Sequence, residues 1–181
     1  MRTPGVAGML LAVISTTAAA GEPPRTVPSV DLDRYAGRWY EVARFPNRFQ
    51  RHCAGDVVAE YTRRPDGRIE VLNSCRTARG ERDDATGVAR VVAEDGSNAK
   101  LKVRFAPAFL SWLPAVWGDY WILDLAPDYS HAIVGDAERK YLWFLSRTPA
   151  ISEELFATLK ERAAAQGFEV SRLEPTVNRA E

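Results

Sequence analysis

The chain has 181 residues, a length that suits one domain. Hydrophobic residues make up 46% of it and charged residues 27%, a balance that provides a core and a wetted surface and excludes disordered and collagen-like chains. The 24 basic and 24 acidic residues give a formal charge of zero. Because no global basic field attracts nucleic acid, we expect no nucleic-acid partner.

Residues 1–20 have the pattern of a signal peptide. Arg2 is followed by a short apolar run over 6–14, and small residues at 17–20 precede Gly21. The run is far below the ~20 residues that a membrane-spanning helix needs. No cysteine lies near the cleavage site to accept a lipid, so we expect an exported, soluble and unanchored protein in the periplasm or the medium. A frayed apolar N-terminus on a cytosolic protein is the alternative.

The two cysteines, Cys53 and Cys75, both lie in the part that would remain after cleavage. An even number in an exported chain predicts one disulfide, and the alternative is two free buried thiols. A hairpin that turns at 65–67 would place Val58, rather than Cys53, opposite Cys75. The bridge therefore requires the chain at Cys53 to fold back.

Residues 21–30 are rich in proline and are predicted to be extended, before a domain that covers 31–175. A single helical turn over 31–36 is followed by short segments with two-residue alternation, the pattern of half-buried strands. Eight strands are predicted, with no helix between them, which indicates an antiparallel meander. Their ranges are 39–45, 57–62, 69–74, 86–93, 100–105, 117–125, 129–134 and 140–146.

Short and long connections alternate along these strands. Tight turns are predicted at 64–67, 94–97 and 126–128, and longer loops at 46–55, 77–83, 106–116 and 135–139. In an all-β, eight-stranded up-and-down barrel this alternation closes one end and opens a mouth at the other, and such a barrel holds one small ligand. An α-helix capped by Ser152 and ended at Gly167 is predicted to pack outside the barrel, before a short edge strand at 168–173.

Three sequence blocks at the ends of these strands resemble those of the lipocalin family. Gly37 and Trp39 form a G-x-W motif, Asp128 and Tyr129 belong to a second block that departs from the usual Thr-Asp-Tyr at Pro127, and Arg147 matches a third. Residues 141–149 and 167–171 are similar to bacterial outer-membrane lipocalins, apolipoprotein D and plant temperature-induced lipocalins. The resemblance covers residues 31 to about 175.

The resemblance implies that Trp39 closes the narrow end of the barrel and that Arg147 lies across its indole. The guanidinium would also donate hydrogen bonds to backbone carbonyls of the 31–36 turn. Both residues would then be structural, and the alternative is a direct contact between Arg147 and the ligand.

Parity along the strands, anchored at Trp39 and Arg147, predicts the inner wall. Many of the residues expected to face inward are small, which favours an apolar cavity over a filled core, although those near the closed end would pack as an ordinary core. Glu41 also falls inward, and the parity of the 117–125 strand stays open. The residues expected to line the ligand are Ala43, Ala59, Tyr61, Val71, Ala89, Val91, Val103, Phe105, Tyr141 and Trp143.

Two groups of residues are predicted at the mouth. Arginines on the loops, namely Arg48, Arg51 and Arg76 with Arg79, Arg82 and Arg139 nearby, could meet an anionic headgroup, or could be solvated loop charges. An apolar loop carries Phe109, Leu110, Trp112 and Leu113. Clustered exposed aromatics mark a contact surface, so this loop could be a lid, a homodimer patch or a transient membrane contact.

The function predicted is carriage or storage of a fatty acid, lysophospholipid or similar amphiphile, without a cofactor or metal. The resemblance to bacterial outer-membrane lipocalins implies a role in cell-envelope lipid maintenance. One alternative is a lipocalin-fold enzyme that uses a cavity cysteine on a lipid or isoprenoid; no motif here suggests a nucleophile and base, and His52 and His131 are the only histidines. A third possibility, an outer-membrane barrel, would require Lys100, Lys102 and Arg104 to line a lumen.

Overall fold

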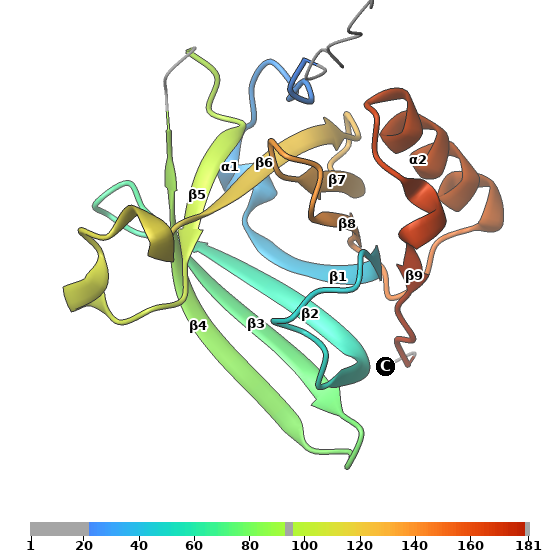
Figure 1. Cartoon of the computed structure of the whole chain (residues 1–181), viewed down its shortest axis with the longest axis horizontal. Helices are drawn as coiled ribbons and strands as arrows, with labels where there is room; N and C mark the ends of the chain where they lie inside the picture. The colour runs from blue at the N-terminus through green and yellow to red at the C-terminus, as the bar shows by residue number, and fades with distance from the viewer. Residues whose placement is uncertain (1–21, 93–95, 180–181) are drawn as a thin grey trace, which may run out of the picture.

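The structure is a computed structural model, which describes residues 22–92 and 96–179; the predicted signal peptide lies outside them. Figure 1 shows strands that wrap around a central axis, with one helix against the outside. The strands are β1 (Gly37–Arg44), β2 (Cys53–Arg63), β3 (Ile69–Thr77), β4 (Arg82–Val91), β5 (Lys100–Arg104), β6 (Gly118–Leu125), β7 (His131–Gly135), β8 (Leu142–Ser146) and β9 (Glu174–Pro175).

Strands β1 to β8 form a closed antiparallel up-and-down barrel, which confirms the predicted architecture. Each strand pairs with the next along the chain, and β1 closes the barrel by pairing with both β8 and β2. The β1–β2 pairing covers only Gly37–Tyr40 opposite Val58–Tyr61. Further along, β9 takes the place of β2 beside Ala43 and Arg44, so the C-terminal segment covers the seam where β1 and β2 separate.

The long loop predicted at 77–83 is wrong, because β3 and β4 continue beyond the barrel as a hairpin. β3 runs to Thr77 and β4 begins at Arg82, and the turn between them is closed by a hydrogen bond from Thr77 N to the Glu81 carbonyl at 2.8 Å. Residues at the start of β4 are exposed. Both faces of such a hairpin meet water, so its sequence lacks the apolar alternation that identifies a strand.

Helix α2 (Glu153–Ala165) packs on the outside of the barrel, as predicted. Ser152 caps it by accepting a hydrogen bond from Leu155 N at 3.2 Å. Leu159 and Ala163 are buried against an outer apolar layer that includes Phe144 of β8. The edge strand predicted at 168–173 is wrong.

Between the helix and β9, the chain forms a short 3₁₀ turn, η3 (Val170–Arg172). Phe168 is buried in the layer between α2 and the barrel. The chain therefore reaches the sheet only at Glu174–Pro175.

Candidate functional site: the barrel interior and its mouth

Trp39 and Arg147 form the closed end of the barrel. The indole is fully buried, and its Nε1 donates to the carbonyl of Tyr35 at 2.8 Å. Arg147 Cζ lies 3.9 Å from the indole centroid, so the predicted stacking is present. The guanidinium donates to the carbonyls of Arg38 at 2.7 Å, of Arg34 at 2.7 Å and of Tyr35 at 3.2 Å.

The turn at the closed end explains why the first motif begins with glycine. Helix α1 (Leu32–Tyr35) is capped by Asp31, whose side chain accepts from the backbone N–H groups of Asp33 and Arg34. Gly37 then has φ +89°, and a Cβ there would lie 3.5 Å from Nη1 of Arg147. Glycine adopts this left-handed conformation without a steric penalty, so β1 can start directly beside the guanidinium.

The second block holds the opposite side of the same end. Asp128 accepts from Ser130 N at 3.0 Å, and Tyr129, with φ +65°, accepts from Asp31 N through its hydroxyl at 2.8 Å. Arg147 Nε donates to the Tyr129 carbonyl at 3.3 Å. The three motif blocks therefore meet in one hydrogen-bonded cluster at the closed end. A proline at position 127 is compatible with this arrangement, in which its carbonyl accepts from Arg34.

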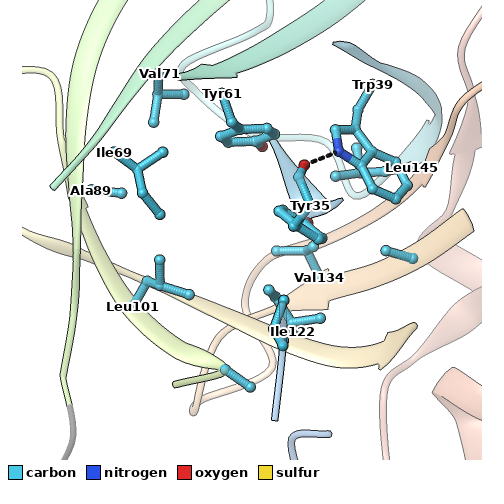
Figure 2. Packing of buried hydrophobic residues seen from close by; sticks show 13 residues of the cluster. Tyr35, Trp39, Tyr61, Ile69, Val71, Ala89, Leu101, Ile122, Val134 and Leu145 are labelled. Atoms are coloured by element: carbon cyan, nitrogen blue, oxygen red, sulfur yellow. Dashed lines mark hydrogen bonds between the residues drawn. The ribbon is translucent and has the colours of Figure 1, made fainter. Parts of the chain in front are cut away.

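The inner wall brings together most of the residues predicted to line the ligand, and Figure 2 shows three of them, Tyr61, Val71 and Ala89. Tyr61, Val71 and Ala89 are buried in one apolar cluster that also contains Trp39 and Leu101. Facing the same cluster, but only half-buried, are Ala59, Val91, Val103 and Trp143. Tyr141 and Phe105 lie nearer the mouth: the Tyr141 ring stacks on Trp143, and the Phe105 ring covers Gly87 and is 43% exposed.

The inward position predicted for Ala43 is wrong because β1 contains a bulge. Glu41 lies opposite Leu145, but Ala43 lies opposite Phe144, so one extra residue reverses the parity of the strand. Ala43 is consequently buried under α2, in the outer layer, and Arg44 faces inward opposite Trp143. Strand alternation alone does not predict where such a bulge occurs.

Three tyrosines that come from separate elements meet inside the barrel. Tyr35 ends α1, Tyr61 lies on β2 and Tyr120 lies on β6, and the hydroxyl of Tyr120 is 2.8 Å from each of the other two. Burial raises the pKa of Tyr61 to about 12, and it also raises the pKa values of Tyr35 and Tyr120 well above the usual 10. All three phenols are therefore neutral at physiological pH. The inward orientation of Tyr120 resolves the parity that the sequence left open.

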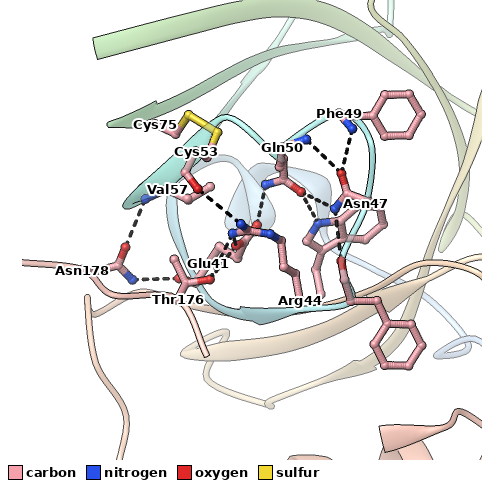
Figure 3. Close-up of polar contacts among 12 residues, drawn as sticks. Glu41, Arg44, Asn47, Phe49, Gln50, Cys53, Val57, Cys75, Thr176 and Asn178 are labelled. Carbon is pink, nitrogen blue, oxygen red and sulfur yellow. Dashed lines mark hydrogen bonds and ion pairs between the residues drawn. A yellow bond between two sulfur atoms is a disulfide. The ribbon is translucent and has the colours of Figure 1, made fainter. Parts of the chain in front are cut away.

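A polar network around Glu41 organises the mouth (Figure 3). The carboxylate is buried and accepts from Arg44 Nη1, from Thr176 Oγ1 and from Gln50 Nε2, each at 2.6 Å. Gln50 in turn accepts from Trp143 Nε1 at 2.9 Å. The network thus joins β1, the 45–52 loop, β8 and the C-terminal segment, and a buried ion pair of this kind is expensive to break.

The arginines predicted to line the rim do not gather there. Arg48 stacks on Phe49 in the 45–52 loop, and Arg51 is exposed on the same loop. Arg76 is wrong as a rim residue, because it extends from the outer face of β3 and pairs with Asp56 at 2.7 Å. Arg82 lies on the same outer wall, which borders a groove of about 460 Å³. Arg139 donates instead to the Gln166 carbonyl, beside the end of α2.

The apolar loop between β5 and β6 folds against the outer wall rather than across the mouth. It contains two 3₁₀ turns, η1 (Ala108–Leu110) and η2 (Pro114–Val116), and projects sideways from the barrel in Figure 1. Phe109 and Trp112 are 75% and 76% exposed, whereas Leu110 and Leu113 are half-buried. Trp112 lies beside Arg90 and Lys102, on the outside of β4 and β5. The loop is therefore not a lid in this structure.

A closed eight-stranded barrel, a G-x-W indole covered by a following arginine and an outer helix are thus present in one chain. The model of a lipocalin-like domain matches residues 30–178. The chain belongs to the lipocalin family. This confirms the resemblance carried by the three sequence blocks.

This lipocalin has relatives in plants and bacteria. It is 45% identical to temperature-induced lipocalin-1 of Arabidopsis thaliana over 151 residues, which cover 83% of this chain and 80% of that protein. It is 38% identical to the outer membrane lipoprotein Blc of Citrobacter freundii over 173 residues, which cover 94% and 93%. Among solved structures, insecticyanin of the tobacco hornworm Manduca sexta has a TM-score of 0.65 at 20% identity, covering 88% and 85%, and shows the same fold.

Both cysteines of the lipocalin are used in a disulfide, as predicted. Cys53 and Cys75 are bonded, with their Cα atoms 5.6 Å apart. The predicted register was wrong by one residue: Val58 pairs with Ser74, and two bulges in β2 then place Cys53 opposite Thr77, diagonal to Cys75. Neither sulfur is a thiol, so an enzyme that uses a cavity cysteine would have no nucleophile here.

His52 lies beside the disulfide. His52 Nε2 lies 2.8 Å from Asp83 and 3.7 Å from the sulfur of Cys53. These atoms resemble a ligand set, but both cysteine sulfurs there are in the disulfide and offer no thiolate. Within the described residues, no helix is both long and apolar enough to cross a membrane.

Proposed function

We propose that this lipocalin carries or stores one amphiphile with an acyl chain, such as a fatty acid or a lysophospholipid, inside its barrel. The observation that carries this proposal is the apolar inner wall above the Trp39 end. Ala59, Val91, Val103 and Trp143 face the interior cluster and yet remain half-buried, which indicates that the side chains of the barrel do not fill the space between them. An apolar interior with few polar groups suits a hydrophobic ligand.

The mouth geometry supports a ligand whose chain lies inside and whose polar end lies near the 45–52 loop. Phe49 lies 5.7 Å from Tyr141, ring to ring, and Tyr141 stacks on Trp143, so an aromatic surface leads from the loop into the barrel. Arg48 and Arg51 are the predicted rim cations that this loop carries. Because they are exposed, they should adjust the choice of headgroup and contribute little to affinity.

The test is a titration of fatty acids of increasing length against two variants at neighbouring positions. Ala59 faces the interior cluster, whereas Val58 lines the outer groove, so Ala59→Trp should block the site and Val58→Trp serves as its control. Each methylene removed from water contributes ~0.8 kcal/mol, so affinity should rise with chain length until the barrel is filled. Affinity that is indifferent to length, or equal loss in both variants, would contradict an interior site.

Export to the cell envelope, and membrane contact through the apolar loop, complete the proposal. The pattern of residues 1–20 and the relative named as an outer membrane lipoprotein support export. The exposed rings of Phe109 and Trp112 support a transient contact with a membrane from which lipid is collected.

Sedimentation with phosphatidylglycerol vesicles tests the membrane contact. The double variant Phe109→Ser/Trp112→Ser should lose vesicle binding, while Phe49→Ser, which removes an exposed ring from the other loop, should retain it. A concentration-dependent dimer that the double variant abolishes, without vesicle binding by the wild type, would instead assign the loop to self-association. The mature N-terminus of a periplasmic preparation, expected near Gly21, tests export.

A further inference from the structure

We infer that the deep end of the barrel binds a hydrogen-bond-accepting oxygen of the ligand through the hydroxyls of Tyr35, Tyr61 and Tyr120. The inference rests on the proposed interior site and adds a chemical requirement to it. The part of the ligand that lies deepest should carry a carbonyl, ether or hydroxyl oxygen rather than end as bare hydrocarbon.

The three hydroxyls are hydrogen-bonded in a row, with that of Tyr120 in the middle. Its oxygen is 2.8 Å from the hydroxyl of Tyr35 and 2.8 Å from that of Tyr61. Within the described residues, neither Tyr35 nor Tyr61 has another hydrogen-bond partner for its hydroxyl. The only polar contacts that these three oxygens make there are thus with one another.

A count of protons shows that the three hydroxyls cannot satisfy all of their hydrogen-bond donors among themselves. Three neutral phenols carry three O–H protons, and each of the two oxygen–oxygen contacts can hold only one of them. Tyr120 has a single proton, so it cannot donate to both neighbours. Whichever way the two bonds run, one O–H on Tyr35, Tyr61 or Tyr120 has no acceptor within the group.

The described residues offer no other acceptor for that proton, although Tyr120 is only half-buried. Tyr35 and Tyr61 belong to the buried apolar cluster with Trp39, Leu101 and Ile122, and Figure 2 shows both rings in the middle of the barrel, between its walls. Burial also keeps the phenols neutral, because it raises their pKa values. A buried donor without an acceptor is unfavourable, and an oxygen of the ligand would remove that cost.

Nearby Arg147 does not offer an alternative donor at this depth. Its nitrogens donate to the carbonyls of Arg34, Tyr35, Arg38 and Tyr129, and its guanidinium lies across the indole of Trp39. A packing role alone would be served equally by phenylalanine at the three positions. Two of the three hydroxyl protons are used within the group, and the remaining one points to an acceptor inside the barrel, which an oxygen of the ligand would supply.

The experiment compares a plain fatty acid with its ω-hydroxy derivative, at the chain length where the plain acid binds most tightly to the wild type. Affinities are measured by calorimetry for the wild type and for the triple variant Tyr35→Phe/Tyr61→Phe/Tyr120→Phe. Removing all the hydroxyls together leaves no unpaired partner, so the variant should fold. Tyr40→Phe, which removes a hydroxyl on the outer wall, is the matched control.

In the triple variant, the affinity of the hydroxy acid relative to the plain acid should fall about tenfold or more compared with the wild type, because a buried hydroxyl then finds no partner. The ratio should not change in Tyr40→Phe. The same ratio in all three proteins, with the plain acid still bound tightly, would overturn this inference and leave the proposed function intact. Binding of neither acid to the wild type would overturn both.

Discussion

The two ends of the barrel are stabilised by different kinds of interaction. At the closed end, Trp39 is fully buried and the guanidinium of Arg147 donates to four backbone carbonyls. At the mouth, the groups that meet are side chains: Glu41 binds Arg44, Thr176 and Gln50. Backbone partners cannot move without unfolding a turn, whereas Gln50, which lies on the 45–52 loop, can exchange its side-chain partners.

This difference separates stability from function along the barrel axis. Trp39 and Arg147 pack densely at the closed end, and the indole N–H and the guanidinium both donate to backbone carbonyls, so substitutions of these two residues should change the free energy of unfolding. The mouth contains the exposed ring of Phe49 and the loop arginines, so substitutions there should change ligand affinity more than stability. Substitutions at the two ends show on which side of this division a residue falls.

The largest effect is expected at the closed end. Trp39→Ala removes a fully buried indole and leaves a cavity, which should lower the free energy of unfolding by about 3–5 kcal/mol. Denaturant unfolding measures it, with Trp112→Ala as the control because that indole is 76% exposed. Similar losses in the two variants would mean that the closed end has no special role in stability.

The disulfide, like the buried pair of Glu41 and Arg44, should be an exception at the mouth. Cys53 and Cys75 are separated by 22 residues, and a bridge that closes such a loop stabilises by about 3 kcal/mol in the chain-entropy model. Cys53→Ser/Cys75→Ser should therefore lower the melting temperature while the fatty-acid length profile stays the same. An unchanged melting temperature would show that the ladder between β2 and β3 already restricts this segment.

Arg147→Ala should have a smaller effect than Trp39→Ala, about 2 kcal/mol, from lost stacking and lost charge-assisted hydrogen bonds. Arg147→Lys should recover only part of this, because an ammonium cannot reach several carbonyls in one plane. Loss of ligand binding at unchanged stability would reassign Arg147 from the closed end to the ligand.

The closed end could be predicted because its three sequence blocks resemble those of the lipocalin family, and the resemblance implied that Arg147 stacks on Trp39, as it does. Gly37 also has a local reason, because its φ of +89° favours glycine. The mouth was predicted less accurately than the closed end. The bulge after Glu41 reverses the parity of β1, which put Ala43 under α2, and no residue type marks that bulge.

The position of Arg76 was predicted wrongly and the tyrosine group was not predicted at all, for related reasons. Arg76 was assigned to a loop, but β3 continues past the barrel and turns that side chain to the outer wall, where Asp56 binds it. Tyr120 lies on the strand whose parity the alternation left open. Contacts among residues 35, 61 and 120 depend on three elements, so only the folded barrel brings them together.

The smallest predicted effect concerns Asp56, which joins β2 to the C-terminal segment at the outer wall. Burial would raise its pKa, but the backbone N–H of Arg179 and the guanidinium groups of Arg76 and Arg179 outweigh this and lower the pKa to about 2. An acid with a lowered folded-state pKa contributes stability that is present above the unfolded pKa, near 4, and is lost as pH falls through 2.

Asp56→Asn should therefore lower the free energy of unfolding at pH 7 by about 1 kcal/mol, a value discounted because the Asp56 side chain is 24% exposed to screening solvent. Asparagine tolerates the φ of +50° at this position, so the substitution adds no backbone strain. The difference between wild type and variant should shrink between pH 4 and pH 2, and Arg76→Gln should reduce it at pH 7. A difference that stays constant from pH 7 to pH 2 would mean that Asp56 acts through its turn geometry and not through its charge.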